Sequence, residues 1–160
     1  MAVLSLDEAA HTSAAARRAG RLVVLTNGVF DLLHIGHVRY LQYARSLGDI
    51  LIVAVNDDAS VRHNKGPSRP VTPQDERAET LAALACVDAV TIFAAPTPAA
   101  VIAAVQPDVL VKGADWAEDA IVGRDVVEAR GGRVVRAALE PGQSTSAIIA
   151  RIHATERGAR

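Results

Sequence analysis

Five short apolar runs recur along the chain and are separated by segments of helical character. They cover residues 21–26, 50–56, 89–93, 109–112 and 133–139. Within them Val, Leu and Ile follow one another without polar alternation, which is typical of strands covered on both faces. Their alternation with helices predicts an α/β fold, a Rossmann-like doubly wound parallel sheet of about five strands with helices on both faces.

Proline and glycine mark the predicted helix ends. Thr72 before Pro73, and Thr97 before Pro98, each offer a capping hydroxyl ahead of a proline, whose missing N–H is harmless in a first helical turn. The glycines expected to stop helices are Gly20, Gly48 and Gly131.

The chain is expected to form one domain over residues 1–160, because no linker, repeat or low-complexity segment divides it. We expect an N-terminal helix over 6–19 and a catalytic core over 20–153. A last helix begins at about Thr145, and the C-terminus is expected to be frayed. A chain of 160 residues is long enough to support a full core without disulfides.

Composition excludes several classes of protein. Seventeen Lys and Arg against eighteen Asp and Glu give a net charge of −1, and aromatic residues make up 3%. The basic surface and stacking side chains of a nucleic-acid binder are therefore missing. The single cysteine, Cys86, cannot form an internal disulfide, and no segment reads as a signal peptide or membrane span, so a cytoplasmic protein without membrane contact is expected.

The stretch TNGVFDLLHIGH, residues 26–37, carries two histidines close to a turn. Gly28 allows a tight turn after the strand, and helical character then continues to Gly48. His34 and His37 are spaced i, i+3, so both rings lie on one face of the first turns. Free backbone N–H groups and the positive end of a helix dipole favour phosphate there.

Other interpretations of the two histidines stay open at this point. A histidine at a helix start is often a surface residue or a satisfied core residue. Zinc sites on helices usually space two histidines i, i+4 with a glutamate between, which this stretch does not do. A nicotinamide site or a P-loop is disfavoured, because neither G-x-G-x-x-G nor G-x-x-x-x-G-K-[ST] occurs.

The pattern T-N-G-x-F-D-x-x-H-x-G-H resembles the signature of the cytidylyltransferase-like nucleotidyltransferases. The resemblance implies that His34 and His37 hold the phosphates of a nucleoside triphosphate, with Gly36 leaving room for the ligand. It also implies that a backbone segment lines the α-phosphate pocket, formed by Thr26, Asn27, Gly28, Val29 and Phe30.

Residues 55–77 resemble the segment of that family that brings a basic side chain to the triphosphate, and Lys65 is the matching position. Taken alone, Lys65 reads as an exposed loop charge. The same holds for Arg69, and Arg77 is equally well interpreted as a helix-surface residue paired with a neighbouring acid.

The segment VKGADW, residues 111–116, resembles the loop of the family near the base and the acceptor. Lys112, Gly113 and Asp115 are then nucleotide contacts, and Trp116 is either a substrate contact or a loop anchor buried against the core.

The segment PGQSTSAII, residues 141–149, resembles the second phosphate-binding motif of the family. Its hydroxyls also suit an ordinary helix cap. The residues expected to contact nucleotide here are Ser144, Thr145 and Ser146.

The phrases LIVAVNDDAS, KGPSRPV and PDVLVKGAD most resemble the adenylyltransferase half of bifunctional heptose kinase/adenylyltransferases. This implies transfer of AMP from ATP to a sugar 1-phosphate, specifically D-glycero-D-manno-heptose 1-phosphate, giving ADP-heptose and pyrophosphate. Two alternatives remain: a cytidylyltransferase or other nucleotidyltransferase on another sugar or polyol phosphate, such as glycerol 3-phosphate, and a non-catalytic nucleotide-binding module.

Two positions depart from the pattern: Val29 stands where many relatives have cysteine, and Gln143 is a variable position. With 160 residues there is no room for a sugar-kinase domain, so a separate kinase is expected.

The resemblance also assigns roles to residues. His34, His37 and Lys65 are expected to be catalytic, and Asp31, Asn56, Arg69 and Trp116 to bind substrate, with Asp31 also capping the helix that carries the histidines. Mg²⁺ is expected to enter with ATP, without a metal site built from protein ligands, and a homodimer is possible because relatives are often dimers.

Overall fold

The computed structural model describes residues 2–138, 140 and 142–158 and shows a single sheet of six parallel strands. The strand order is β1-β4-β3-β2-β5-β6. The strands are β1 (Ala2–Leu4), β2 (Val23–Gly28), β3 (Ile50–Asn56), β4 (Ala89–Phe93), β5 (Val109–Gly113) and β6 (Arg133–Ala137).

Five of these strands were predicted, and β1 was missed. It has three residues, pairs in parallel with β4 from the register Ala2 to Ala89, and leaves Val3 47% exposed. The reason is that β1 is a short edge strand directly before a helix, and its residues form no apolar run that can be told apart from the start of that helix. β6 follows its prediction to Ala137, and Leu139 lies outside the described residues.

Two layers of helices cover the sheet. The helices α1 (Leu6–Arg18), α5 (Ala99–Val105) and α6 (Arg124–Ala129) pack on one face, and α2 (Ile35–Arg45) and α4 (Gln74–Ala82) on the other. Along β2, Val23 and Leu25 point into the first layer and Val24 into the second, all fully buried. Burial of the sheet on both faces therefore explains the Val-rich runs.

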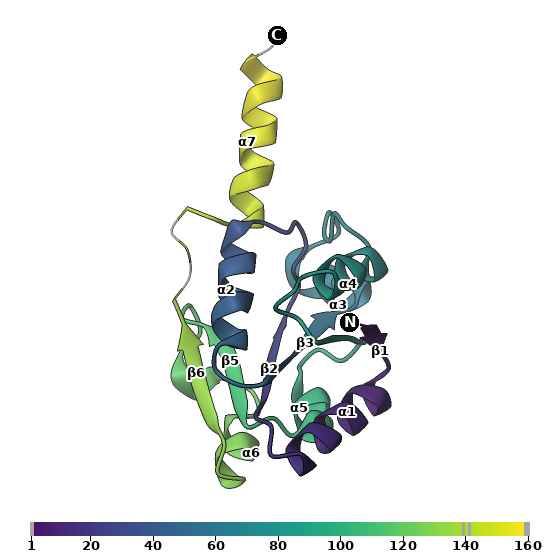
Figure 1. Cartoon of the computed structure of the whole chain (residues 1–160). Coiled ribbons are helices and arrows are strands. Elements are labelled where there is room, and N and C mark those ends of the chain that lie inside the picture. Colours follow the sequence, from purple (N-terminus) through teal and green to yellow (C-terminus); the bar gives the residue numbers. More distant parts are fainter. Residues whose placement is uncertain (1, 139, 141, 159–160) are drawn as a thin grey trace.

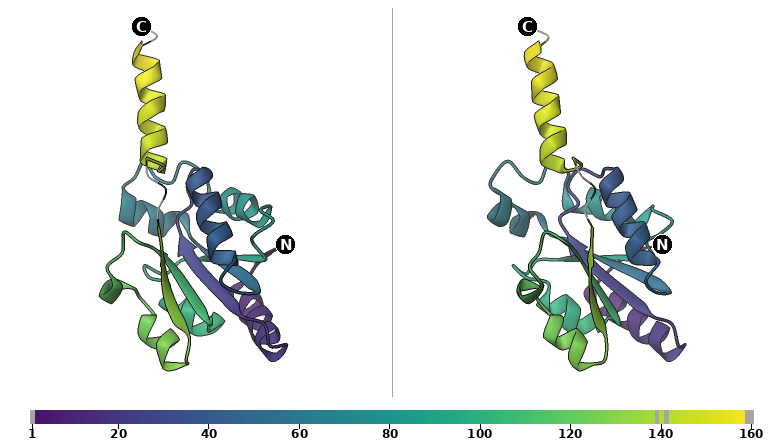
Figure 2. Two further views of the ribbon diagram at one scale, coloured as in Figure 1. Left: turned by 60° about the vertical axis from the view of Figure 1, so that its left-hand side comes forward. Right: turned by 90° about the vertical axis from the view of Figure 1, so that its left-hand side faces the viewer.

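Three further helices belong to the connections and the C-terminus: α3 (Asp58–Lys65), the single 3₁₀ turn η1 (Glu118–Ala120) and α7 (Thr145–Gly158). Lys65 was interpreted as a loop residue, so α3, which ends at Lys65, is a correction. Figures 1 and 2 show α7 projecting away from the sheet, so that its first turn is the part nearest the other loops. Within the described part of the chain, no helix combines the length and apolar character needed to cross a membrane.

The end of α1 follows its prediction to within one residue, whereas α2 ends at Arg45, three residues before Gly48. Gly20 and Gly131 lie just beyond helices at φ of 74° and 80°, which glycine adopts without strain. The N-caps of α4 and α5 are Pro73 and Pro98, neither with a side-chain cap, so the expected threonine caps are wrong.

The sheet has one point where the strand order reverses, between β2 and β5. From β2 the chain moves outward through β3 to β4, and then returns to place β5 on the other side of β2. Loops that leave the carboxyl ends of β2 and β5 consequently diverge in opposite directions and leave a crevice. Gly28 and Gly113 end these two strands and mark its floor.

The orientation of α2 is tested by truncating one side chain on each face. Leu41 is fully buried in the core and Tyr43 is 45% exposed. We expect Leu41→Ala to lower the free energy of unfolding by about 2–5 kcal/mol, because it leaves a cavity. Tyr43→Ala is the matched control and should cost less than about 1 kcal/mol in the same urea titration. Equal losses would contradict this packing of α2.

Candidate active site

A cavity of about 390 Å³ lies at the carboxyl ends of β2 and β5, where the strand order reverses. It is lined by segments from four distant parts of the chain: the loop after β2, the end of α3, the loop after β5 and the start of α7. The predicted site residues that line it are Asn27, Gly28, Val29, Phe30, Asp31, His34, Gly36, His37, Lys65, Arg69, Gly113, Asp115, Ser144, Thr145 and Ser146.

The two histidines stack face to face, with ring centroids 3.8 Å apart and an interplanar angle of 22°. His34 is the N-cap of α2, which begins at Ile35, so the helix starts later than the sequence suggested. Both rings therefore stand at the first turn, where backbone N–H groups lack helical partners. His37 also packs edge-on against Phe30, with ring centroids 5.2 Å apart.

Burial favours the neutral form of both imidazoles. Burial lowers the pKa of His37 to about 4, and the neighbouring His34 lowers it further. Burial also lowers the pKa of His34. The buried Nδ1 atoms of both rings have no hydrogen-bond partner within the described part of the protein. Two such atoms in one stacked pair are unusual, since buried polar groups are normally paired.

Gly36 fits closely between the histidine pair and the start of α7. A Cβ at this position would lie 3.0 Å from the ring of His34 and 3.1 Å from Cβ of Gln143. The absence of a side chain at Gly36 therefore allows the loop before α7 to approach the histidine helix. Gly36 was expected to leave room for the ligand, and His34 and Gln143 occupy part of that room.

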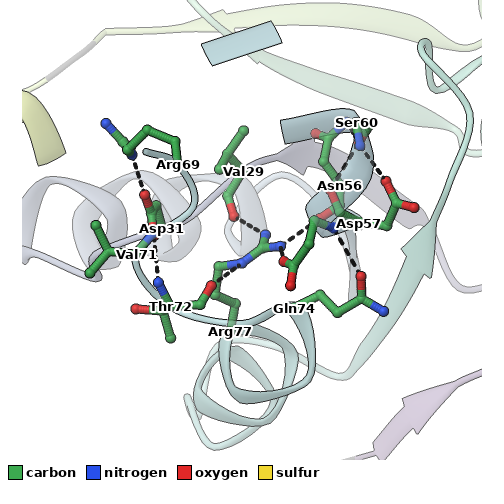
Figure 3. Close-up of polar contacts among 11 residues, drawn as sticks. Val29, Asp31, Asn56, Asp57, Ser60, Arg69, Val71, Thr72, Gln74 and Arg77 are labelled. Atoms are coloured by element: carbon green, nitrogen blue, oxygen red, sulfur yellow. Dashed lines mark hydrogen bonds and ion pairs between the residues drawn. The ribbon is translucent and has the colours of Figure 1, made fainter. Parts of the chain in front are cut away.

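Asp31 does not cap α2, contrary to expectation. Its carboxylate is 3% exposed and accepts hydrogen bonds from the backbone N–H groups of Val71 at 2.7 Å and Thr72 at 2.9 Å. Arg69 forms an ion pair with the other carboxylate oxygen. Asp31 thus anchors the segment before α4 through its contacts with Arg69, Val71 and Thr72, as Figure 3 shows.

Three of the predicted site residues support the cavity from behind instead of lining it. Thr26 is fully buried, and its hydroxyl contacts the Val111 carbonyl at 3.0 Å. Asn56 contacts Ser60 through its side-chain amide at 3.3 Å. Lys112 is 7% exposed and donates to Oδ1 of Asn27, and burial lowers the pKa of its ammonium to about 8.

Trp116 also lies outside the cavity lining, and it is 49% exposed, so the expectation of a buried anchor is wrong. The ammonium of Lys112 lies 5.4 Å from the centroid of its ring. This cation–π contact ties the loop after β5 to the strand that precedes it.

Lys65 is the last residue of α3, is exposed, and lines the cavity. Its interpretation as an exposed charge is therefore compatible with its interpretation as the basic residue near the triphosphate. Ser144 caps α7: its hydroxyl accepts from the N–H of Ala147 at 3.1 Å. Because Thr145 and Ser146 follow in the same turn, a cap and free hydroxyls stand together at this helix start.

Sequence reasoning missed three residues of the lining: Tyr40, Glu140 and Gln143. Tyr40 lies one turn after His37, so its i+3 spacing was a usable signal. Its hydroxyl lies 2.7 Å from that of Thr26, and burial is the main reason that its pKa rises to about 12. Glu140, which forms an ion pair with Arg39, lies between β6 and α7.

The described residues contain no group of three or more His, Cys, Asp and Glu that could hold a metal ion. Mg²⁺ is commonly bound by one or two carboxylates together with substrate phosphates. Asp115 is a carboxylate of the lining. Asp115 could therefore contribute an oxygen ligand to a cation that enters with a triphosphate.

An open parallel sheet with neutral donors, a lysine and two helix starts converging at its switch point defines a nucleotide-binding α/β protein. The chain belongs to the cytidylyltransferase-like family, whose sequence model matches residues 25–155. It is a nucleotidyltransferase.

Individual relatives agree with this assignment. The chain is 57% identical over 150 residues to the bifunctional protein HldE of Alkalilimnicola ehrlichii. It is 54% identical over 150 residues to that of Citrifermentans bemidjiense. Each match covers 94% of this chain and 31% of the relative, so the chain spans about a third of their length.

A solved structure, the lipopolysaccharide core biosynthesis protein from Thermoplasma volcanium GSS1, is also similar. It matches with a TM-score of 0.63 and 29% identity, covering 76% of this chain and 98% of that one. The likeness supports the architecture described above.

The buried neutral histidine predicts a pH dependence of stability. The ordinary pKa of 6.5 applies in the unfolded chain, and the folded value for His37 is about 4. Between these values the unfolded state binds a proton that the folded state does not, so stability falls as pH falls. We expect the stability difference between wild type and His37→Gln to shrink from pH 7 to pH 4.5 in urea titrations. A difference that stays constant over this range would contradict a buried neutral imidazole.

Proposed function

We propose that the protein is an adenylyltransferase that transfers AMP from ATP to a sugar 1-phosphate, with D-glycero-D-manno-heptose 1-phosphate as the acceptor. The observation that carries this proposal is the convergence of the stacked histidines, Lys65 and the first turn of α7 on one cavity. The relatives named HldE supply the choice of substrate.

Each group in the cavity has a distinct role in this proposal. His34 and His37 donate ring N–H groups to the phosphates. Ligand binding thereby supplies a hydrogen-bond partner or a proton to the Nδ1 atoms, which have no partner in the described part of the protein. Lys65 and the hydroxyls of Ser144, Thr145 and Ser146 bind the β- and γ-phosphates. Mg²⁺ bound to the triphosphate supplies additional neutralisation of its charge.

The reaction is a displacement at phosphorus. A phosphate oxygen of the sugar 1-phosphate forms a bond to the α-phosphorus, and the bond from that phosphorus to the oxygen bridging to the β-phosphate breaks. Pyrophosphate leaves with the electron pair. Since a phosphate monoester is already anionic at neutral pH, no general base is needed, and catalysis consists of positioning and charge stabilisation.

Of the residues expected to bind the acceptor, Asp31 and Arg69 line the cavity. Arg69 keeps its ion pair with Asp31 and is 17% exposed, so part of its guanidinium is available to an anionic group. Asn56 and Trp116, which lie outside the lining, act on the acceptor only through neighbouring residues or after a movement of their loops.

The histidine pair is tested by substitution. His37→Ala is expected to lower turnover by roughly 10² or more, the scale for losing one preorganised donor, and His34→Ala should behave similarly. Because the two rings stack, the double variant should lose much less than the product of the single losses. Pyrophosphate release measures turnover, and circular dichroism verifies folding. A folded His37→Ala variant with wild-type turnover would contradict the catalytic role of His37.

Substrate choice is tested by a panel of pyrophosphate-release assays. ATP, CTP, GTP and UTP are each combined with both anomers of heptose 1-phosphate, other sugar 1-phosphates and glycerol 3-phosphate. The highest kcat/KM is expected for ATP with heptose 1-phosphate. Preference for CTP with a polyol phosphate would identify a cytidylyltransferase, and nucleotide binding without turnover on any pair would identify a binding module.

A further inference from the structure

Arg77 is the largest fully buried side chain among the described residues, and its guanidinium contacts Val29, which lines the active-site cavity. Its position on α4 had been interpreted as the helix surface, which is wrong. Figure 3 shows its guanidinium between the loop after β2 and the end of β3. A buried guanidinium requires several acceptors, because each N–H without a partner costs free energy.

Four segments of the chain supply these acceptors. Nη1 donates to the carbonyl of Val29 at 2.6 Å, and Nη2 to the carbonyl of Asn56 at 2.8 Å. Nη2 also contacts the carboxylate of Asp58 at 2.7 Å, and Nε donates to the carbonyl of Thr72 at 2.9 Å. One cation thus joins four segments: the loop after β2, the end of β3, the start of α3 and the start of α4.

The hydrogen bond from Arg77 to the Val29 carbonyl determines the direction in which the backbone N–H of Phe30 points. The peptide bond between Val29 and Phe30 is trans, so its C=O and N–H point in opposite directions. With the carbonyl turned toward Arg77, the N–H of Phe30 points away from the Arg77 guanidinium. Both Val29 and Phe30 line the cavity. Phe30 has a φ of 49°, an uncommon conformation for a residue with a side chain, which persists only when neighbours impose it.

We propose that Arg77 is a positioning residue that, by holding the Val29 carbonyl, aims the backbone N–H of Phe30 at the phosphate undergoing transfer. The proposal rests on the nucleotidyltransferase function proposed above. Through Asp58 and the Asn56 carbonyl the same guanidinium orients α3, whose last residue is Lys65. Arg77 therefore sets two phosphate donors relative to each other without contacting substrate.

Lysine cannot replace this arrangement. Its ammonium is a single point with three donors, whereas the guanidinium fork reaches acceptors on several sides at once. In Arg77→Lys the positive charge is retained, while some of the backbone carbonyls lose their partner. This variant separates charge from geometry, and Arg77→Met removes the charge as well.

A second arginine of the chain provides a matched control. Arg17 of α1 donates to the Val105 carbonyl at 2.7 Å, the Ser13 hydroxyl at 2.8 Å and the Gln106 carbonyl, and none of these described partners lines the cavity. Arg17→Lys should lose stability through the same kind of broken contact. It should keep the kcat and KM of the wild type.

The experiment measures kcat and KM for ATP at a temperature where circular dichroism shows every variant folded. We expect Arg77→Lys to lower kcat roughly tenfold or more with a smaller change in KM, since the donor acts on charge that develops in the transition state. Arg77→Met should lose at least as much, and millimolar guanidinium should restore part of the kcat of Arg77→Ala. A folded Arg77→Lys variant with the kcat of the wild type would overturn the proposal, as would equal effects of the Arg17 and Arg77 substitutions.

Amide NMR gives a second readout that does not depend on turnover. Adding MgATP to the wild type should shift the Phe30 amide resonance, and the shift should be reduced in Arg77→Lys and retained in Arg17→Lys. If the wild type shows these shifts but releases no pyrophosphate on any substrate pair, the proposed function fails and the positioning role stands. If MgATP leaves the Phe30 resonance unmoved in the wild type, the positioning role fails.

Discussion

Burial of both faces of the parallel sheet is the constraint on which the site depends. Helices cover β2 and β3 on each side, and their strand residues are almost entirely buried. Polar side chains are costly in such an interior, so they collect where the strands end. The reversal of strand order between β2 and β5 then opens the crevice that the cavity-lining residues surround.

Beneath this crevice the loops are held by buried ions instead of apolar contacts. Asp31 anchors the backbone at Val71 and Thr72, and Arg77 joins Val29, Asn56 and Thr72 through their carbonyls. Each ion has several partners, which keeps its burial tolerable. The arrangement gives loops without regular structure the fixed geometry that stabilisation of a phosphoryl group requires.

The cavity itself combines elements of different rigidity. The histidine pair stands on α2, which packs into the core, whereas the hydroxyls of Ser144 to Ser146 stand on α7, which projects from the molecule (Figures 1 and 2). The two meet at Gly36, where a methyl group would crowd Gln143. A nucleotide that spans them therefore adds a contact between the core and the C-terminal helix.

The sequence alone determined the α/β class, five of the six strands and the identity of most cavity residues, because strand burial and the H-x-G-H signature are local patterns. Only the tertiary structure decided where Asp31 and Arg77 act, since their partners lie 40 and 48 residues away, at Val71 and Val29. It also placed Thr26, Asn56 and Lys112 behind the cavity and added Tyr40, Glu140 and Gln143 to it. Whether a polar residue near a strand end faces ligand or supports a loop depends on packing between distant segments, which no local pattern encodes.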